Sequence, residues 1–267
     1  MPQPKRQRQK AGRQFRQEQI KAAQRRRKRR NQAFAIVVAV ALIGIVAFAA
    51  SRGGDNTDTT VTAGETLPKS ACPKLDGSSP RTLDFKKKPP MCINAKNKKK
   101  YTAHVSTTEG DYDIDLDTDK TPKTVNNFIF LSRYHYYDNT TITRIDDSIE
   151  ILQGGAPHTE SIADPGPGYT IDDEGSGFKY SEGDIVMARA QGPNSGAAQY
   201  FLVYGNKASA LNSQGTYVTF GKVKGEGLAV WKKIGALFEK CPDGDQTCLG
   251  GHPSHKVTIT SVKIEEA

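Results

Sequence analysis

The first thirty residues are almost free of acidic side chains, and this scarcity changes how the net charge of the chain must be interpreted. Thirteen Lys and Arg residues face a single acid, Glu18, so this stretch has a net charge of +12. The whole chain carries +9, so the remaining residues together are slightly acidic. The stretch also lacks the interleaved aromatic rings on which nucleic-acid bases stack. No nucleic-acid partner is therefore predicted.

Long apolar runs are absent except at residues 33–50, where 18 consecutive residues carry no charge. As a helix this run spans roughly 27 Å, close to the hydrocarbon thickness of a bilayer. It has no polar face, which argues against a core helix. Six basic residues at 25–30 precede it, and this pattern predicts a cytoplasmic N-terminus with the remainder of the chain extracytoplasmic. We interpret the run as a single-pass anchor in the cell membrane, in contact with lipid.

A cleaved signal peptide is the alternative interpretation of this run. Ala47-Phe48-Ala49 has the small-x-small pattern of a cleavage site. The apolar run, however, exceeds the usual signal core of about 7–15 residues, which favours an uncleaved anchor. The predicted organisation is then as follows: a basic cytoplasmic tail (1–32), the anchor (33–50), a flexible linker (51–70), a cysteine-containing extension (71–100) and a folded domain (101–267).

Cysteine is scarce, and all four cysteines follow the apolar run. Disulfides are the default expectation on the outer side of a membrane. Four cysteines allow three pairings, and short loops favour Cys72 with Cys92 and Cys241 with Cys248. A metal site that combines the second pair with the two histidines after it matches none of the usual zinc spacings, so no metal is predicted.

Periodicity predicts a domain made mostly of short β-strands. Alternation predicts strands at 101–107 and 111–117 joined by a hairpin. A helix is expected from Pro122, capped by Thr121, with one face packed inward. Further strands are expected at 140–145, 186–190, 200–204, 216–220 and 255–264, and a second helix at 227–237. The last strand changes phase between Ile259 and Val262, which suggests a bulge. Many short strands with two amphipathic helices fit a closed barrel.

Short motifs then follow one another in a fixed order. They are residues 121–128 (Thr-Pro-Lys-Thr-Val-Asn-Asn-Phe), Ile142-Thr143-Arg144, Gln153-Gly154-Gly155, Gly192-Pro193-Asn194-Ser195, Gln199-Tyr200-Phe201 and Phe220-Gly221-Lys222-Val223. Each motif alone is weak, but their order resembles the cyclophilin family of peptidyl-prolyl cis-trans isomerases, in a membrane-anchored bacterial form. The resemblance implies an all-β fold, a closed antiparallel barrel of about eight strands capped by two helices.

The resemblance also implies a site for extended proline-containing peptides. Arg144 is its catalytic residue, and Gln153 orients Arg144 and the substrate. The other residues assigned to peptide binding are Ile149, Ile151, Ala188, Arg189, Ala190, Gln199, Phe201, Leu211 and Tyr217. The expected activity is rotation about X–Pro bonds of extracytoplasmic polypeptides during folding, by a monomer without cofactor or metal.

This chain departs from the family pattern at four places. One extra residue stands between Arg144 and Gln153, and Ile149 or Glu150 replaces a pocket phenylalanine. Ala210 replaces a tryptophan and Tyr217 a histidine, with Arg189 in place of an asparagine. These departures imply reduced activity. Two alternatives therefore stay open: a peptide-binding or chaperone module with little turnover, and a structural envelope protein that acts through its basic tail.

Overall fold

The computed structural model of this chain describes residues 65–94, 99–190, 192–242 and 248–267. The predicted basic tail, the predicted anchor at 33–50 and most of the predicted linker lie outside these ranges. Within the described ranges, no helix has both the length and the apolar character needed to cross a bilayer.

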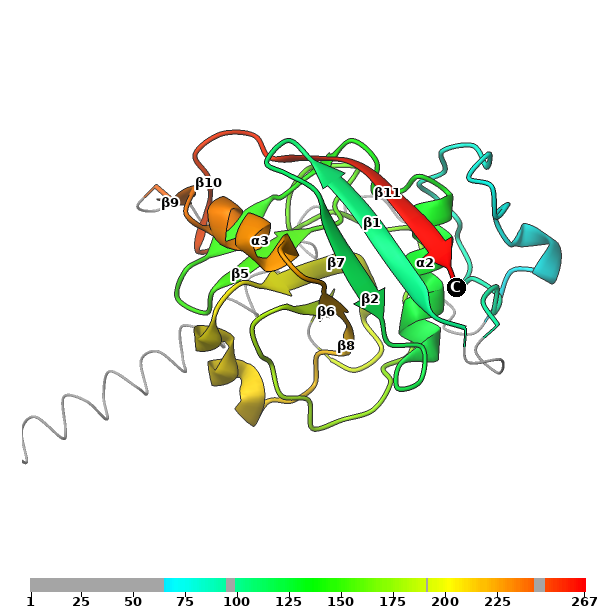
Figure 1. The fold of residues 1–267 in the computed structure, drawn as a ribbon. Helices are drawn as coiled ribbons and strands as arrows, with labels where there is room; N and C mark the ends of the chain where they lie inside the picture. The colour runs from blue at the N-terminus through cyan, green and yellow to red at the C-terminus, as the bar shows by residue number, and fades with distance from the viewer. Residues whose placement is uncertain (1–64, 95–98, 191, 243–247) are drawn as a thin grey trace, which may run out of the picture. The chain divides into compact units, whose positions relative to one another are not determined.

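Across the described residues, eleven strands form one curled sheet in which every strand pair is antiparallel (Figure 1). The strands are β1 (Tyr101–Thr107), β2 (Tyr112–Leu116), β3 (Thr140–Thr141), β4 (Arg144–Asp146), β5 (Ile151–Gly154), β6 (Asp184–Arg189), β7 (Gly196–Val203), β8 (Thr219–Val223), β9 (Phe238–Lys240), β10 (Gly251–Pro253) and β11 (Thr258–Glu266). Their order is β3-β11-β1-β2-β8-β6-β7-β5-β4-β10-β9. The number of about eight strands implied by the resemblance is lower than the eleven observed, because several of the eleven are short strands of only two or three residues.

The strand predicted at 140–145 is divided into β3 and β4. β3 pairs with β11, whereas β4 pairs with β5. Between them, Ile142 N–H donates to the carbonyl of Val257 at 3.0 Å and Thr143 N–H to the carbonyl of Gln153 at 2.9 Å. One bent segment therefore pairs with β11 at one end and with β5 at the other. These two strands lie far apart in the strand order, so the segment brings the two ends of the sheet toward each other.

Alternation along β5 and β7 places apolar side chains on both faces of the sheet. Leu152, Tyr200 and Leu202 belong to the main hydrophobic core. Their neighbours Ile151 and Phe201 point to the opposite face, because successive strand residues alternate, and they are buried there too. This second buried group lies outside the main core and also contains residues that follow β7 in the chain. Its further members include Val186, Val203, Ala208, Leu211 and Tyr217.

The helix α2 (Pro122–Arg133) begins where predicted, with Thr121 at the N-cap position, but the Thr121 side chain makes no capping hydrogen bond. The hydroxyl of Thr121 donates instead to the carbonyl of Asp117 at 3.2 Å. The carboxylate of Glu174 accepts the backbone N–H groups of Lys123 at 2.9 Å and Thr124 at 2.7 Å. A carboxylate from a distant loop therefore satisfies the free N–H groups of the first turn, where negative charge is also favoured by the helix dipole.

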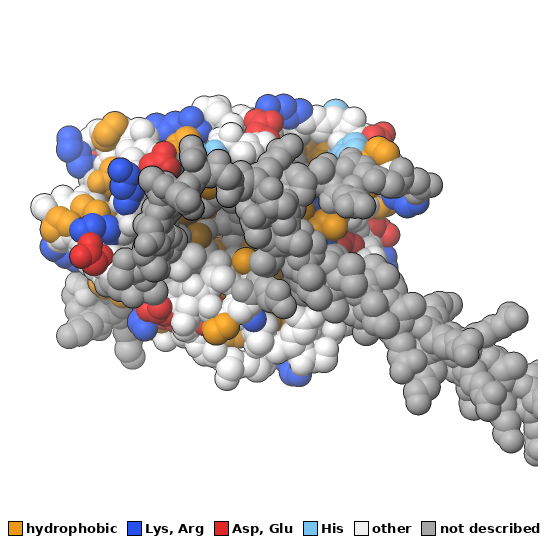
Figure 2. Space-filling view, turned by 180° about the vertical axis from the view of Figure 1, so that it is seen from behind, with side chains coloured by type: hydrophobic (Ala, Val, Ile, Leu, Met, Phe, Trp, Pro, Cys, Tyr) orange, Lys and Arg blue, Asp and Glu red, His pale blue; other side chains and the backbone are white. Residues whose placement is uncertain are grey.

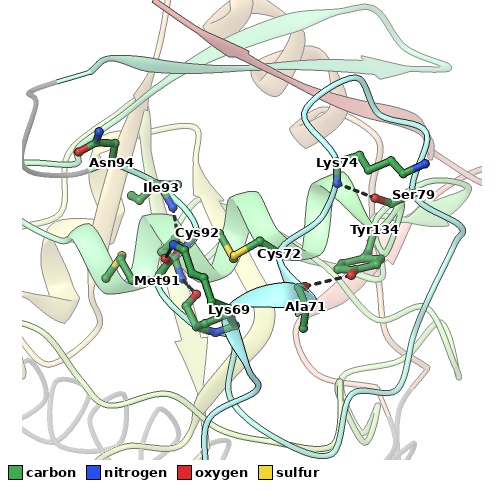
Figure 3. Close-up of a disulfide and its surroundings, with 12 residues drawn as sticks. Lys69, Ala71, Cys72, Lys74, Ser79, Met91, Cys92, Ile93, Asn94 and Tyr134 are labelled. Atoms are coloured by element: carbon green, nitrogen blue, oxygen red, sulfur yellow. Dashed lines mark hydrogen bonds between the residues drawn. A yellow bond between two sulfur atoms is a disulfide. The ribbon is translucent and has the colours of Figure 1, made fainter.

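The prediction of a single inward face for α2 was too narrow, since its residues from Thr124 onward are all buried. The cysteine-containing extension covers the side of α2 that faces away from the sheet. The ring of Phe85 lies 4.9 Å from that of Phe130 and 5.1 Å from that of Tyr134. The side-chain oxygen Oδ1 of Asn126 accepts the backbone N–H of Cys92 at 2.7 Å. The disulfide Cys72–Cys92 closes this extension beside α2, as predicted (Figure 3).

The C-terminal part of the chain agrees with the predicted elements except at their ends. The second helix, α3 (Gly227–Gly235), carries the buried Trp231 and packs on β2 and β5. The strand predicted at 216–220 is β8, about three residues later. Pairing of β1 with β11 shifts register between Ser106 and Thr107, opposite the predicted phase change, which confirms the bulge. The short β9–β10 hairpin was not predicted from the sequence, and the predicted disulfide Cys241–Cys248 closes it.

Charged side chains of both signs are interspersed on the face of the molecule that Figure 2 shows. Many charged side chains of the described residues are paired, such as Lys99 with Glu266 at 2.6 Å and Lys222 with Asp184 at 2.9 Å. His104, in β1, is an ordinary strand residue between the carboxylates of Asp113 and Glu265. This mixed surface fits a sequence whose excess positive charge lies in its first thirty residues.

His135 gives the attachment of the extension a predictable pH dependence. Its Nδ1 lies 2.7 Å from the Asp138 carboxylate and its Nε2 lies 2.8 Å from the carbonyl of Gly77. Both partners only accept hydrogen bonds, so the ring satisfies both when it is doubly protonated. The Asp138 carboxylate first, and the Gly77 carbonyl second, raise the pKa of His135 above 6.5. A raised folded-state pKa contributes stability below the unfolded-state pKa, and this contribution is lost as pH rises through the folded-state pKa.

We therefore expect wild type to exceed His135→Asn in free energy of unfolding by more at about pH 5.5 than at about pH 8.5. Asparagine is chosen because His135 has a positive φ of 55°, which asparagine tolerates. Urea unfolding at both pH values measures the difference, and His104 cancels because it is present in both proteins. A difference that grows with pH would contradict this assignment.

Candidate active site

Three of the predicted site residues lie in one row across neighbouring strands. Arg144 in β4 pairs in register with Gln153 in β5, and Gln153 pairs with Phe201 in β7. Register partners in antiparallel strands project to the same face of the sheet. The row therefore lies on the face opposite the main core, where Ile151 and Phe201 are buried.

The guanidinium of Arg144 is held by acceptors from three different residues. Its Nε donates to the carbonyl of Leu249 at 3.1 Å and its Nη1 donates to Oε1 of Gln153 at 3.0 Å. Its Nη2 donates to the carboxylate of Asp146. A guanidinium has five N–H donors, so these contacts leave one N–H on Nη1 and one on Nη2. The side chain is only 14% exposed, so its charge is directed rather than fully solvated.

The hydrogen bond from Arg144 sets the orientation of the Gln153 side-chain amide. Because its Oε1 accepts from Arg144, its Nε2 must donate elsewhere, and it donates to Oε1 of Gln199 at 2.9 Å. Gln199 in turn donates through Nε2 to the carbonyl of Ile162 at 3.1 Å. A chain of hydrogen bonds from Ile162 to Arg144 therefore fixes both amides.

Aromatic rings form the apolar floor beside the row. The rings of Phe201 and Tyr217 are 5.7 Å apart and nearly perpendicular. Tyr180 lies 6.5 Å from Phe201 and 6.2 Å from Tyr217. Leu211, Ile149 and Ile151 are also buried outside the main core. The arrangement offers apolar surface next to a directed cation.

Tyr180 holds the backbone of Tyr217 in place. Its hydroxyl accepts the N–H of Tyr217 at 2.9 Å and donates to the carbonyl of Tyr217 at 3.1 Å. Burial raises the pKa of Tyr180 to about 12. Burial also raises the pKa of Tyr217, and the cations of Arg189 and Arg144 offset part of that rise. Tyr217 thus stays neutral and lies in the field of both arginines.

The end of β6 forms one border of the site. Ala188 and Arg189 are half-buried and Ala190 is exposed. The Arg189 guanidinium carbon lies 5.6 Å from the centre of the Tyr217 ring, and Nη1 donates to the carbonyl of Gly192. The two residues that replace the family's asparagine and histidine therefore contact each other as a cation–π pair.

The structure distinguishes between the two residues that were expected to replace the pocket phenylalanine. The carboxylate of Glu150 accepts the backbone N–H of Lys207 at 2.8 Å and pairs with its ammonium at 3.1 Å. Glu150 itself has a positive φ of 53°, so the chain turns there and accommodates the extra residue. Ile149 is buried instead, while Ala210 is exposed and places no ring at the site.

Sequence reasoning missed three residues that contact the site. Asp146 stands two positions after Arg144, so strand alternation places both side chains on one face. This spacing could have identified Asp146 from the sequence. Tyr180 and Leu249 act from distant loops, and Leu249 acts through its backbone carbonyl, which no side-chain pattern reveals. In the part of the chain that the structure describes, no group of three or more His, Cys, Asp or Glu residues is arranged to hold a metal ion.

Comparison with known proteins gives matches over the same part of the chain. The family model described as "Cyclophilin type peptidyl-prolyl cis-trans isomerase/CLD" matches residues 102–264. The "Probable peptidyl-prolyl cis-trans isomerase B" of Mycobacterium tuberculosis is 32% identical over 174 residues, covering 60% of this chain and 53% of that protein. Its counterpart in Mycobacterium leprae is 30% identical, covering 61% and 57%. This chain thus matches only about half the length of these two relatives.

Two further matches cover nearly all of the similar protein. "Peptidyl-prolyl cis-trans isomerase-like 1" of Gibberella zeae is 33% identical over 164 residues, covering 61% of this chain and 93% of that protein. A crystal structure of a Cryptosporidium parvum cyclophilin type peptidyl-prolyl cis-trans isomerase aligns with a TM-score of 0.48 and 28% identity. That alignment covers 61% of this chain and 98% of the other.

Proposed function

Because the chain belongs to the family of cyclophilin-type peptidyl-prolyl cis-trans isomerases, we propose that it catalyses cis–trans isomerisation of X–Pro bonds in polypeptides. The observation that carries this proposal is the guanidinium of Arg144, held through Nε, Nη1 and Nη2. Its contacts with the described residues leave two N–H donors free, and it stands in register with the row that leads to the Phe201 ring. A cation beside an apolar floor suits a proline ring and the amide that precedes it.

The reaction requires no covalent bond to the protein. Rotation about an amide has a barrier of about 20 kcal/mol, because the planar bond loses its resonance as it twists. In the twisted state the prolyl nitrogen regains its lone pair and becomes a hydrogen-bond acceptor. A donor from Arg144 to that nitrogen is stronger in the twisted state than in the planar one, which is the condition for catalysis. Each 1.4 kcal/mol of this preference raises the rate about tenfold.

The other predicted residues hold the peptide in position for this step. Gln153 and Gln199 are fixed by the chain of hydrogen bonds, so their orientation costs little when a peptide binds. Phe201 supplies the surface for the proline ring, with Leu211 and Tyr217 in the same buried group. Ala188, Arg189 and Ala190, at the end of β6, run beside the extended peptide. The bent segment between β3 and β4 supports a closed barrel, which would keep Arg144 rigid.

The activity is tested by measuring the isomerisation rate of an Ala-Pro peptide with the full chain in detergent micelles. We expect acceleration over the spontaneous rate that increases in proportion to protein concentration. A chain that unfolds cooperatively in urea but gives no acceleration at any peptide concentration would refute the proposal. Saturable peptide binding without acceleration would instead favour the peptide-binding alternative, which the absence of a ring at Ala210 supports.

We also propose that the folded domain is extracytoplasmic and attached to the membrane by residues 33–50. The uncharged run and the basic block before it support this location. The disulfides Cys72–Cys92 and Cys241–Cys248 agree with it, because disulfides persist mainly in oxidising compartments. Protease added to intact, wall-free cells should digest the domain. A domain that resists digestion until the cells are lysed would place it in the cytoplasm.

A further inference from the structure

The hairpin of β9 and β10 adds to the sheet beside the strand that carries Arg144. Lys240 pairs with Gly251, and Phe238 pairs with Pro253. The disulfide Cys241–Cys248 joins the two strands beyond their paired ends, with its Cα atoms 5.7 Å apart. The N–H of Cys241 donates to the carbonyl of Gly250 at 3.4 Å. The disulfide thus ties the segment that contains Leu249 and Gly250 to the end of β9.

This hairpin lies directly against β4. Gly251 pairs with Ile145, the neighbour of Arg144. A Cβ atom on Gly250 would lie 3.1 Å from the carbonyl oxygen of Ile145 and 3.2 Å from the Asp146 carboxyl carbon. Gly250 also has a positive φ of 75°, which glycine adopts without strain. The close approach of backbone to backbone brings the carbonyl of Leu249 to the Nε of Arg144, 105 residues away in the chain.

The contact at Nε differs in kind from the other two contacts of Arg144. Gln153 and Asp146 belong to β5 and β4, so they hold Nη1 and Nη2 from the same strand pair that carries Arg144. Leu249 approaches from a separate element. An acceptor at Nε limits rotation of the guanidinium about its side-chain axis. The contacts at Nη1 and Nη2, which come from one strand pair, restrict this rotation less. A half-buried Nε without an acceptor would also carry a desolvation cost.

We propose that the disulfide hairpin positions Arg144 for catalysis through the carbonyl of Leu249. This inference rests on the proposed isomerase function and adds a role for the Cys241–Cys248 disulfide. Cys241, Cys248 and Leu249 are positioning residues, because none of them touches the prolyl bond. When the disulfide is absent, the hairpin loses its closure and the carbonyl no longer has a fixed place. The guanidinium then points at the prolyl nitrogen for only part of the time, which lowers kcat more than it changes KM.

The other disulfide provides a matched control. Cys72–Cys92 lies in the extension beside α2, among Ala71, Met91, Ile93 and Tyr134 (Figure 3). None of these residues belongs to the site. Replacing Cys72 and Cys92 by serine removes a covalent cross-link of the same kind without touching any contact of Arg144. A general loss of stability and a loss of positioning can therefore be separated.

The test compares the full chain, the Cys241→Ser/Cys248→Ser variant and the Cys72→Ser/Cys92→Ser variant. We expect kcat of the first variant to fall about tenfold, as for a small misplacement of a reacting group, with KM changed less than about threefold. The second variant should keep the wild-type kcat while losing stability in urea. A hairpin variant with kcat within twofold of wild type, or equal losses in both variants, would overturn the inference. A wild-type chain without activity would instead refute the proposed function.

A spectroscopic measurement tests the contact itself. In protein labelled with ¹⁵N-arginine, the Nε–H of Arg144 should exchange slowly with solvent in wild type and in the Cys72→Ser/Cys92→Ser variant. It should exchange rapidly in the Cys241→Ser/Cys248→Ser variant. If that variant does not fold, Gly250→Ala keeps the disulfide and displaces the hairpin locally, and the same loss of protection and of kcat is expected. Unchanged protection in the folded variant would contradict the positioning role.

Discussion

Replacing Arg144 by alanine is expected to lower kcat/KM for an Ala-Pro peptide by about 100-fold or more, the range seen when one transition-state donor is removed. Binding of the peptide should weaken much less, because Gln153, Gln199 and the Phe201 ring remain. The reason is that the guanidinium interacts with the prolyl nitrogen mainly in the twisted state. Measuring kcat and KM with the full chain separates the two effects.

Two control variants sharpen this test. Arg81 also donates to backbone carbonyls, those of His135 at 3.2 Å and Asp138 at 3.1 Å, but it lies in the extension. Arg81→Ala should therefore leave kcat/KM unchanged. Arg144→Lys keeps the positive charge but loses the planar group that three acceptors hold, so most of the activity should still be lost. Near-normal activity in Arg144→Lys would mean that charge alone suffices.

Gly155→Ala is expected to destabilise the fold by about 2–6 kcal/mol, from backbone strain and from overpacking together. Gly155 has a φ of 91°, and a Cβ atom there would lie 2.6 Å from the carbonyl oxygen of Ala198 and 3.0 Å from Cα of Gln199. This explains the second glycine of the Gln153-Gly154-Gly155 motif. It lets β5 pass close to β7 at the point where Gln199 must reach Gln153. Urea unfolding measures the loss.

Gly192→Ala is the matched control for this prediction. Gly192 has a similar φ of 96°, but a Cβ atom there would meet no heavy atom of the described residues within 4 Å, apart from its own residue and its chain neighbours. It should therefore show the backbone strain alone, about 1–3 kcal/mol. The difference between the two variants isolates the contact with Ala198. Equal losses in both would show that the close approach of β5 and β7 is relieved at little cost.

The motif residues could be assigned to one site from the sequence because the order of the motifs resembles that of the family, and the strand register explains why these residues meet. Arg144, Gln153 and Phe201 stand at positions that β4, β5 and β7 place side by side, and alternation sends all three to one face. The hairpin at the start of the domain, the bulge in β11 and both disulfide pairings also followed from local patterns. For the hairpin, the bulge and the disulfides, neighbouring residues or short loops carry the information.

The contacts that sequence did not reveal depend on distant segments. Thr121 stands at the N-cap of α2 as predicted, but the first-turn N–H groups are bonded by Glu174, about 50 residues away, and not by the Thr121 side chain. Burial of α2 on its outer side depends on Phe85 in the extension. The choice between Ile149 and Glu150 depended on the positive φ of Glu150 and on Lys207. The hold on Arg144 by Leu249 uses a backbone carbonyl, which any residue type supplies.

The most direct test of the proposed catalysis is NMR exchange spectroscopy on an Ala-Pro peptide at saturating concentration, with a catalytic amount of the full chain. Exchange between the cis and trans signals reports turnover, and chemical-shift changes of the protein report binding in the same sample. Wild type should give exchange far faster than the spontaneous process, and Arg144→Ala should bind the peptide with exchange near the spontaneous rate. Rapid exchange that persists in Arg144→Ala would contradict the assignment of catalysis to this guanidinium.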